Sequence, residues 1–448
     1  MTLPTARWLT RVDRDDGPIY LAILKALESA IVDGDLQAGE QLPPQRAVAV
    51  QLGVDFTTVT RAYAAARARG MVEGAVGRGT FVRGRASEDE AGLIDLSMNL
   101  PPPPLDLSLG RLLKETSRAV LDRTDPAALM AYHPGAGSLA QRAAGAAWLA
   151  PTLGEVSPEA ILVSPGAQTA LAALFTTLMR PGDALIVEPL TYPGALSLAA
   201  HLGLRLIACP TDDEGVLPAE LDRLCAEHRP KAIYLIPTLQ NPVATTMGPQ
   251  RRGDVARVAQ SAQVPIIEDD AYGRLPQVPP PAIAALTPRN VWHVATTAKA
   301  LSPGLRTAFV AAPSADQALR LATALRAMSL MASPLTTAVA TAWIREGTAE
   351  RLLAAVRAET RARQTLARDI LPSAVGGPDG VHVWLDLAPG RDPSALRDDA
   401  ARRGLSLVTA QAFAAGPGAR DGLRISLGGP ARREVLAQAL RAVADLLA

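Results

Sequence analysis

A single lysine stands out among the residues that could do chemistry. The chain has 45 lysine and arginine residues, and only four of them are lysine. One of the four, Lys299, lies between two apolar runs in HVATTAKALSPGLRTAF. An arginine side chain stays protonated, whereas a lysine in a pocket that lowers its pKa becomes a nucleophilic amine. Lys299 is therefore a candidate for Schiff-base formation with a carbonyl compound.

Four further residues follow apolar, strand-like runs as Lys299 does. They are Gly166, Tyr192, Asn241 and Asp269. An aspartate in such a place can keep a pyridine nitrogen protonated, which makes the ring an electron sink. An asparagine and a tyrosine can hydrogen-bond a phenolic oxygen, and the face of Tyr192 can stack on the ring.

A phosphate group fits the same set of residues. In SPGAQTAL the turn at Gly166 leads into a predicted helix, whose first N–H groups and dipole favour an anion. Arg306, seven residues after Lys299, adds a bidentate partner for phosphate oxygens. Together these parts predict a site for pyridoxal 5'-phosphate.

Each of these residues has a simpler explanation when it is taken alone. A lone lysine is usually a solvated surface residue, and an aspartate after a strand is often a helix cap. Tyr192 alone is more often a core or interface residue, SPGA alone is an ordinary strand-to-helix turn, and Arg306 alone could be an ion-pair partner. The order of all of them along one chain favours the cofactor site.

Strand-like and helical runs alternate from about residue 110 onward. The strand-like runs are AILVS, DALIVEP, LRLIACP, AIYLIP, VPIIEDD, VWHVATT and RTAFVAAP. Strands that are apolar on both faces are typical of a mostly parallel sheet covered by helices. Ligands bind beyond the carboxyl ends of such strands, so this α/β fold would bring the candidate residues together.

The sequence pattern of residues 1–83 predicts a separate domain. Apolar residues recur every four positions from Ile19 to Ile31, on one face of a helix. LPPQRAVAVQLGV predicts a second helix ending at Gly53, and DFTTVTRAYAAARARG predicts a third with Asp55 as its N-cap. MVEGAVGRGTFVRG then alternates as two short strands around a glycine-rich turn. This order predicts a winged helix-turn-helix.

The charge of this unit fits a nucleic acid. Residues 46–85 contain seven arginines and two acidic residues, although the whole chain has a net charge of only +1. In a winged helix-turn-helix the start of the third helix faces base edges in the major groove of double-stranded DNA. The candidate DNA contacts are Arg46, Thr57, Thr58 and Arg61, with Arg78, Gly79 and Thr80 on the hairpin. The alternative is a small helical dimerisation domain.

Length and composition narrow the class of protein. A chain of 448 residues allows two or three domains, and the small, acidic run at 84–94 predicts a linker. DLSMNLPPPPLDL, with its proline run, predicts an extended arm at the start of the next domain. The sequence has no long uncharged apolar run and no signal-peptide pattern, so we expect a cytoplasmic protein. Two cysteines cannot build a disulfide framework, and no His/Cys cluster has metal-ligand spacing, so we expect no metal.

The N-terminal unit resembles the DNA-binding domain of GntR-type bacterial repressors over about residues 17–83. The motifs L-P-x-x-R, L-G-V, T-T-V-x-R-A-Y and G-x-G-T-F-V occur there in order. Asp55 and Phe56 stand where many relatives have serine or asparagine followed by arginine. One base or phosphate contact of the family is therefore expected to be absent.

From about residue 95 to 448 the chain is similar to fold type I, class I aminotransferases. The motifs are YHPGAG, SPGAQTAL, EPLTYPGAL, QNP, IEDDAYGRL, TTAKALSPGLR and GLRISLGG. The resemblance implies a smaller C-terminal α+β subdomain at about 315–448. It implies that Lys299 holds pyridoxal phosphate as a Schiff base and that Asp269 faces the pyridine nitrogen. Asn241 and Tyr272 would hold the phenolic oxygen.

The same resemblance assigns the other contacts of the site. Around the phosphate it places Gly166, Ala167, Gln168, Thr296 and Arg306. It stacks Tyr192 on the ring and gives Arg424 the carboxylate of a substrate or effector. Tyr132 would reach into the neighbouring subunit's site in a homodimer.

Two departures from the aminotransferase pattern affect the site. Ala298 stands where the family usually has serine directly before the lysine, although Thr296 keeps a hydroxyl three residues before Lys299. QNPVATTM lacks the usual Thr-Gly after Asn-Pro, so we expect a loop of different shape. Neither departure removes the core chemistry.

The two halves together resemble the MocR-type regulators. This resemblance implies a cytoplasmic transcription factor that forms a head-to-tail homodimer and binds operator DNA. Its large domain would sense pyridoxal phosphate, an amino acid or amine, or both. One alternative is an active aminotransferase with an appended DNA-binding domain. Another is a DNA-binding protein with a cofactor-free scaffold, against which the retained Lys299, Asp269 and Arg306 argue.

Overall fold

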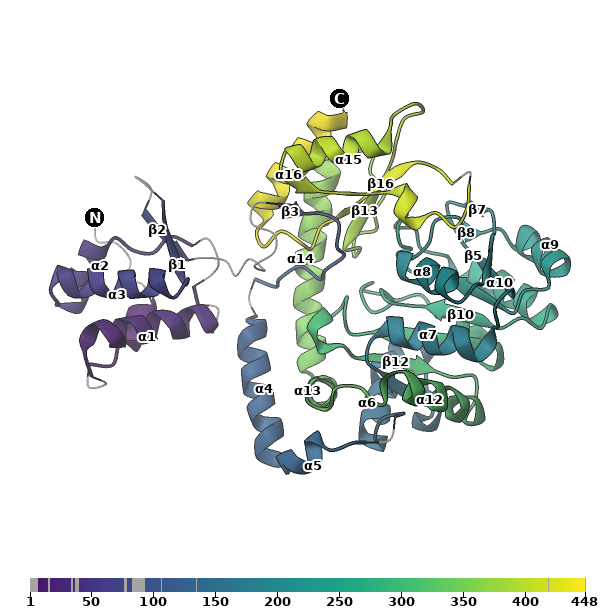
Figure 1. Cartoon of the computed structure of the whole chain (residues 1–448), viewed down its shortest axis with the longest axis horizontal. Coiled ribbons are helices and arrows are strands. Elements are labelled where there is room, and N and C mark those ends of the chain that lie inside the picture. Colours follow the sequence, from purple (N-terminus) through teal and green to yellow (C-terminus); the bar gives the residue numbers. More distant parts are fainter. Residues whose placement is uncertain are drawn as a thin grey trace. The chain divides into compact units, whose positions relative to one another are not determined.

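The computed structural model places most of the chain in two packed units (Figure 1). The structure describes residues 7–14, 17–33, 35–36, 40–75, 79–82, 93–105, 107–133, 135–417 and 419–447. The described residues within 1–92 and 108–115 form one unit, and those within 93–107 and 116–448 form the other. The predicted linker at 84–94 lies almost wholly outside the described residues, and so does Arg78.

The N-terminal unit has the element order of a winged helix-turn-helix. After η1 (Arg7–Arg11) come α1 (Ile19–Val32), α2 (Gln45–Leu52), α3 (Phe56–Ala68) and the antiparallel strands β1 (Val72–Ala75) and β2 (Gly79–Val82). Gly53 ends α2 with a left-handed φ of 60°. Asp55 caps α3 as predicted, since its carboxylate accepts the N–H of Thr57 at 2.8 Å. The apolar faces of the helices meet in one core around the buried Ile23.

A seven-stranded sheet forms the centre of the large unit. Its strand order is β4-β12-β11-β10-β9-β5-β6. Every pair is parallel except those of β12, which runs antiparallel to β4 and to β11. The mostly parallel α/β sheet is therefore confirmed. The strands are β4 (Ile161–Ser164), β5 (Ala184–Val187), β6 (Arg205–Ala208), β9 (Ala232–Leu235), β10 (Ile266–Asp269), β11 (Val291–Thr296) and β12 (Ala308–Ala311).

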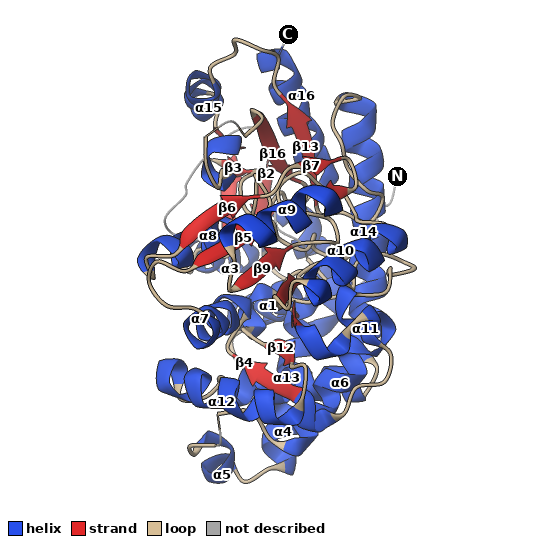
Figure 2. Ribbon diagram, turned by 90° about the vertical axis from the view of Figure 1, so that its right-hand side faces the viewer, coloured by secondary structure: helices blue, strands red, loops and turns tan. Residues whose placement is uncertain are grey.

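Helices cover both faces of this sheet (Figure 2). One side carries α7 (Ala167–Leu178), α8 (Pro193–His201) and α12 (Ala315–Ser329). The other side carries α6 (Leu139–Leu153), α10 (Pro249–Ser261) and α11 (Ile283–Leu286). α9 (Pro218–His228) packs against α10, and α13 (Pro334–Arg345) packs against α6. Because the inner strands are buried on both faces, they are apolar without alternation.

A smaller antiparallel sheet lies near the C-terminus of the chain. Its order is β13 (His382–Asp386), β16 (Gly422–Ser426) and β15 (Val408–Thr409). α14 (Thr348–Ile370), α15 (Pro393–Arg402) and α16 (Arg433–Leu447) surround an apolar core with it. The predicted start of the C-terminal subdomain, at about residue 315, coincides with the start of α12. This helix packs against α7, which covers the large sheet.

Residues 93–105, which we call the arm, run from the smaller sheet towards the large one. Ile94–Asp95 form β3, which pairs in parallel with β14 (Leu405–Ser406). The backbone of Gly428 and Gly429 lies against the carbonyl oxygens of Leu100 and Asp95, where a Cβ at either glycine would overlap them. The arm is thus packed backbone to backbone against the chain that follows β16.

The remaining elements are short or peripheral. They are α4 (Leu109–Arg123), α5 (Pro126–Met130), η2 (Pro158–Ala160), β7 (Thr211–Asp212), β8 (Gly215–Val216), η3 (Pro288–Asn290), η4 (Pro303–Leu305) and η5 (Ala410–Phe413). Among the helices that the structure describes, none is both long and apolar enough to cross a bilayer.

Candidate functional site

The carboxyl edge of the large sheet gathers the residues that the sequence singled out. Gly166, Tyr192 and Asn241 follow β4, β5 and β9, whereas Asp269 ends β10 and Lys299 follows β11. These five strands run in the same direction, so their carboxyl ends meet at one edge. The fold therefore brings these residues to the place where α/β sheets bind ligands.

Lys299 has the lowered pKa that a nucleophilic amine needs. Burial lowers the pKa of its ammonium group to about 8, and the positive charges of Arg424 and Arg306 act in the same direction. The Asp269 carboxylate opposes them. Lys299 Nζ donates a hydrogen bond of 2.6 Å to the main-chain oxygen of Asn99, a residue of the arm.

Asp269 is a buried carboxyl group with one free oxygen. Tyr234 donates its hydroxyl hydrogen to Asp269 Oδ2 at 2.6 Å, whereas Oδ1 is buried with no hydrogen-bond partner among the described residues. Burial raises the pKa of Asp269 to about 6. Tyr234 was not among the predicted site residues, although a tyrosine inside the aliphatic strand β9 indicates a hydroxyl group that needs a partner.

Arg424 of β16 presents part of its guanidinium group to the site. Its Nη1 donates to Asn241 Oδ1 at 2.8 Å, its Nη2 donates to the carbonyl oxygen of Ser97, and its Cζ lies 4.9 Å from the centre of the Phe413 ring. Within the described residues, Nε has no acceptor. Burial lowers the pKa of this guanidinium from its usual value. Arg424 and Asn241 are thus brought together from β16 and the loop after β9.

The start of α7 has the form of an anion site. Gly166 is the N-cap residue of α7 with a left-handed φ of 102°, and no side chain caps the helix. A Cβ at Gly166 would come 2.6 Å from Arg306 Nη2, so only glycine lets this guanidinium lie against the turn. The N–H groups at the start of the helix, including those of Ala167 and Gln168, therefore have no side-chain cap and lie next to the Arg306 charge.

Three other residues were assigned by resemblance, and their surroundings differ. The Thr296 hydroxyl donates to the carbonyl oxygen of Thr307 at 3.3 Å and accepts the N–H of Ala298 at 3.1 Å, so its hydrogen is engaged by the backbone. Gln168 Nε2 donates to Gly194 O at 2.9 Å. Tyr132 is 82% exposed, and its role in a neighbouring subunit stays a prediction.

A chain of hydrogen bonds connects Tyr272 to the loop after β9. Asn99 Nδ2 lies 3.0 Å from Tyr272 Oη and 3.0 Å from His382 Nδ1. His382 Nε2 in turn lies 3.0 Å from the main-chain oxygen of Gln240. All four residues are buried. Of this group, only Tyr272 was predicted from the sequence.

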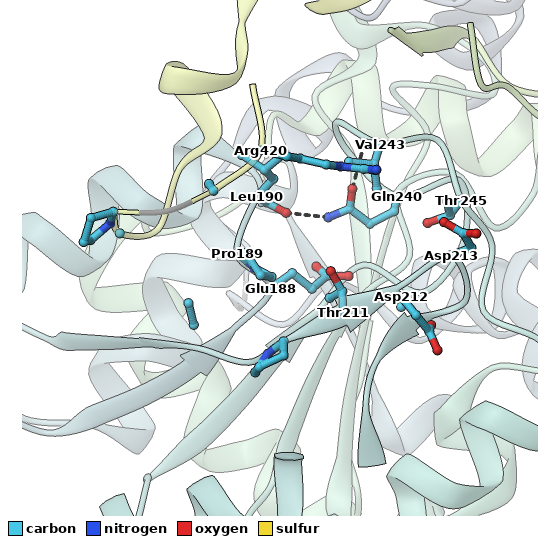
Figure 3. Close-up of a pocket in the computed structure, with 16 residues that line it drawn as sticks. Glu188, Pro189, Leu190, Thr211, Asp212, Asp213, Gln240, Val243, Thr245 and Arg420 are labelled. Atoms are coloured by element: carbon cyan, nitrogen blue, oxygen red, sulfur yellow. Dashed lines mark hydrogen bonds between the residues drawn. The ribbon is translucent and has the colours of Figure 1, made fainter. Parts of the chain in front are cut away.

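A cavity of about 460 Å³ is lined by residues that follow β5 and β6 and by Gln240, the neighbour of Asn241 (Figure 3). Glu188 and Thr211 are among its lining residues, and burial raises the pKa of Glu188 to about 8. The Gln240 side chain lines the cavity and is held at both ends, since Nε2 donates to Leu190 O at 2.7 Å and Oε1 accepts the N–H of Val243 at 2.9 Å. Gln240 therefore has a fixed side chain in the cavity wall, while its main-chain oxygen contacts His382.

The predicted DNA contacts lie on the winged-helix unit. Arg46 and Thr57 are exposed, whereas Thr58 is half-buried. The guanidinium of Arg61 stacks at 3.9 Å from the centre of the Tyr20 ring, which holds it on the surface of α3. Among the hairpin residues, Gly79 is exposed with a φ of 113° and Thr80 is half-buried. Their contacts with DNA stay predictions.

Unpaired polar atoms support a ligand at the carboxyl edge. Buried polar atoms are nearly always hydrogen-bonded in native proteins. Among the described residues, the buried atoms without a partner include Asn99 Oδ1, Gln168 Oε1, Asp269 Oδ1 and Arg424 Nε. Three residues of this group interact with Lys299. Asn99 accepts a hydrogen bond from Lys299 Nζ, and the charges of Asp269 and Arg424 affect the pKa of Lys299. The residues present therefore fit a polar, ionisable group such as pyridoxal phosphate.

Fold and site together define a DNA-binding winged helix joined to a domain of the aminotransferase type. Residues 92–441 match the family model described as aminotransferase class I and II, and residues 19–82 match that of the gntR family of bacterial regulatory proteins. The chain belongs to the class I and II aminotransferase family over its large unit. With its GntR domain it is a MocR-type transcriptional regulator.

Known proteins similar to this chain include regulators and enzymes. The HTH-type transcriptional regulator YdeF of Bacillus subtilis is 30% identical, and the match covers 98% of this chain and 96% of YdeF. The vitamin B6 salvage pathway repressor PtsJ of Salmonella typhimurium is 28% identical, over 83% of this chain and 86% of PtsJ. The α-aminoadipate aminotransferase LysN of Thermus thermophilus has the same fold, with a TM-score of 0.74, 24% identity, and coverage of 86% and 98% of the two chains.

Proposed function

We propose that this regulator holds pyridoxal phosphate at Lys299 and senses the cofactor, an amino acid or amine, or both. The observation that carries the proposal is the pairing of Lys299, whose pKa is lowered to about 8, with Asp269, whose buried Oδ1 has no partner among the described residues. When bound, pyridoxal phosphate supplies an aldehyde that condenses with amines and a ring that withdraws electrons.

Asp269 would hold the ring nitrogen of the cofactor. A buried carboxyl group is stabilised in its charged form by a cationic partner, and Oδ1 is free to accept an N–H. Tyr234 keeps the other oxygen in place. Asp269 would therefore keep a proton on the ring nitrogen.

The start of α7 would hold the phosphate. Gly166 lets Arg306 lie against the turn, and the uncapped N–H groups of Ala167 and Gln168 add donors. The backbone bonds of Thr296 leave its hydroxyl without a hydrogen for the phosphate. We therefore propose that Arg306 and the start of α7 neutralise the charge of the phosphate.

Arg424 would bind an effector that carries a carboxylate. The free Nε and the adjacent Nη2 form one edge of the guanidinium, which suits a bidentate carboxylate. Arg424→Gln should therefore weaken binding of amino acids much more than binding of simple amines. Equal loss for both ligand types in an equilibrium titration would contradict this role.

The ligand would act on gene expression through the DNA-binding unit. A ligand shifts a regulator only if it binds the DNA-competent and DNA-incompetent states with different affinity. The similarity to a regulator named for vitamin B6 salvage supports the cofactor itself as one sensed ligand. We propose a homodimer that binds operator DNA through Arg46, Thr57, Thr58 and Arg61.

One experiment tests the cofactor and the sensing together. Purified protein reconstituted with pyridoxal phosphate is titrated with amino acids and amines while its visible spectrum and its operator affinity are measured. Lys299→Ala should abolish the visible band and the ligand response of operator binding, whereas the exposed Lys231→Ala should change neither. A wild-type protein without a visible band would overturn the proposal. Rapid full cycles of amino transfer would favour the alternative, an active aminotransferase.

A further inference from the structure

His382 is held in one orientation by an acceptor that cannot donate. Its Nε2 lies 3.0 Å from the main-chain oxygen of Gln240. That oxygen also accepts the N–H of Ala244 at 2.7 Å, and the Gln240 side chain is fixed by Leu190 and Val243 (Figure 3). Because a carbonyl oxygen only accepts, the hydrogen of this bond sits on His382 Nε2.

The other ring nitrogen of His382 is therefore an acceptor. Burial, aided by the charges of Arg424 and Lys299, lowers the pKa of His382 to about 3, so its ring is neutral. A neutral imidazole with its hydrogen on Nε2 offers a lone pair at Nδ1. The group 3.0 Å from Nδ1 must donate to it, which identifies that group as the Asn99 amide nitrogen.

The orientation of the Asn99 amide group determines that Tyr272 Oη accepts a hydrogen bond from it. Its two amide hydrogens are directed to His382 Nδ1 and to Tyr272 Oη, each at 3.0 Å. Tyr272 Oη accepts one of them, so its own hydroxyl hydrogen points elsewhere. Burial raises the pKa of Tyr272 to about 12, so the hydroxyl keeps that hydrogen.

We infer that His382 and Asn99 are positioning residues which fix Tyr272 as a hydrogen-bond donor to the ring oxygen of the cofactor. This inference rests on the proposed function, because Tyr272 is assigned to that oxygen. Asn241 would be the second donor: its Oδ1 accepts a hydrogen bond from Arg424, which leaves its amide hydrogens for the same oxygen. Two donors that converge on one oxygen favour its anionic form.

Asn99 is the middle residue of the hydrogen-bonded series His382–Asn99–Tyr272, which we call the relay, and it also contacts Lys299. The main-chain oxygen of Asn99 accepts Lys299 Nζ at 2.6 Å, while its side chain serves Tyr272 and His382. A single residue of the arm thus contacts the reactive amine and sets the direction of the neighbouring hydroxyl. A change at Asn99 should accordingly alter the cofactor's protonation, beyond any effect on its binding.

The test is a pH titration of the visible spectrum of the reconstituted protein. Loss of the Tyr272 donor disfavours the anionic ring oxygen, so the apparent pKa of the chromophore should rise by about one unit in Tyr272→Phe. Asn99→Asp removes both amide donors and offers the Tyr272 hydroxyl a competing acceptor, so it should give a rise of similar size. His382→Leu should give a smaller rise in the chromophore pKa. His382→Gln should restore the wild-type chromophore pKa, because a glutamine amide, like the neutral imidazole, has one acceptor and one donor end.

Ser426→Ala is the matched control. Ser426 Oγ donates to the main-chain oxygen of Met98 at 2.6 Å, next to Asn99 in the arm, but belongs to none of the relay bonds. The inference predicts an unchanged chromophore pKa in this variant. An equal shift in Ser426→Ala, or no shift in Asn99→Asp and His382→Leu, would overturn it.

A second measurement decides the relay without the cofactor. Nitrogen NMR of the imidazole rings in the cofactor-free protein should show His382 neutral, with its hydrogen on Nε2, from pH 5 to 8. A protonated ring, or a hydrogen on Nδ1, would refute the relay even if the cofactor binds. A missing visible band in the wild type would instead refute the proposed function, so the two failures are distinct.

Discussion

Tyr234 and Asp269 form a buried pair in which the tyrosine hydroxyl donates to one carboxylate oxygen at 2.6 Å and the other oxygen has no partner among the described residues. The hydrogen bond fixes the carboxylate, and burial raises its pKa to about 6. Such an arrangement costs folding stability and is ready for a cationic partner. It predicts opposite effects of one substitution on stability and on cofactor binding.

Asp269→Asn should stabilise the cofactor-free protein and abolish tight cofactor binding. The folded-state pKa lies above the unfolded value of 3.8, so stability falls as the pH rises from about 4 to about 6, and the full cost remains above that range. A shift of this size corresponds to about 3 kcal/mol at pH 7. Urea unfolding at pH 7 and at pH 4 would measure the gain, which should shrink at pH 4. The exposed Asp222→Asn serves as the control.

The rate of cofactor uptake should depend on pH through Lys299. Only the deprotonated amine attacks an aldehyde, and the pKa of Lys299 is lowered to about 8. The uptake rate should rise about tenfold per pH unit below that value and level off above it. Stopped-flow absorbance gives this profile. A rate that still climbs tenfold between pH 9 and 10 would indicate an ordinary lysine. Arg424→Gln should move the midpoint upward, because the Arg424 charge lowers the pKa.

Gly166→Ala should weaken phosphate binding through a direct clash. A Cβ there meets Arg306 Nη2 at 2.6 Å, and the backbone φ of 102° is already unfavourable for alanine. We expect a loss of at least tenfold in cofactor affinity, measured by equilibrium dialysis. Gly182→Ala has a similar positive φ of 88° with no atom near its Cβ, so it controls for backbone strain. Equal losses in the two variants would mean that strain alone is responsible.

Arg46→Ala should weaken operator binding without changing the visible spectrum. Arg46 is exposed at the start of α2, and phosphate contacts release counterions, so wild-type affinity should fall steeply with salt and the variant should show a smaller slope. Arg61→Ala should also weaken binding, but it removes the stacking on Tyr20 as well. Electrophoretic shifts across a salt series measure both. Unchanged affinity in both variants would show that another face binds DNA.

The sequence predicted the sheet and its carboxyl-edge residues because both depend on local patterns. Each apolar run formed a strand, and the candidate residues at the ends of five parallel strands fell at the carboxyl edge of the sheet. Asn99 and His382 escaped prediction because they are 283 residues apart and meet only through the packing of the arm on the smaller sheet. The phosphate contact of Thr296 stays a prediction, and in this structure its hydroxyl donates to the main-chain oxygen of Thr307.

The close packing of Gly428 and Gly429 on the arm has a consequence for modularity. Residues at the start of the described part of the large unit pack against residues near its C-terminal end. The position at which the chain enters this unit is therefore fixed by that packing. Exchange of the DNA-reading module between related regulators would preserve the ligand site only if the junction falls upstream of residue 93. A junction at the proline run 101–104 would remove Asn99 together with the module.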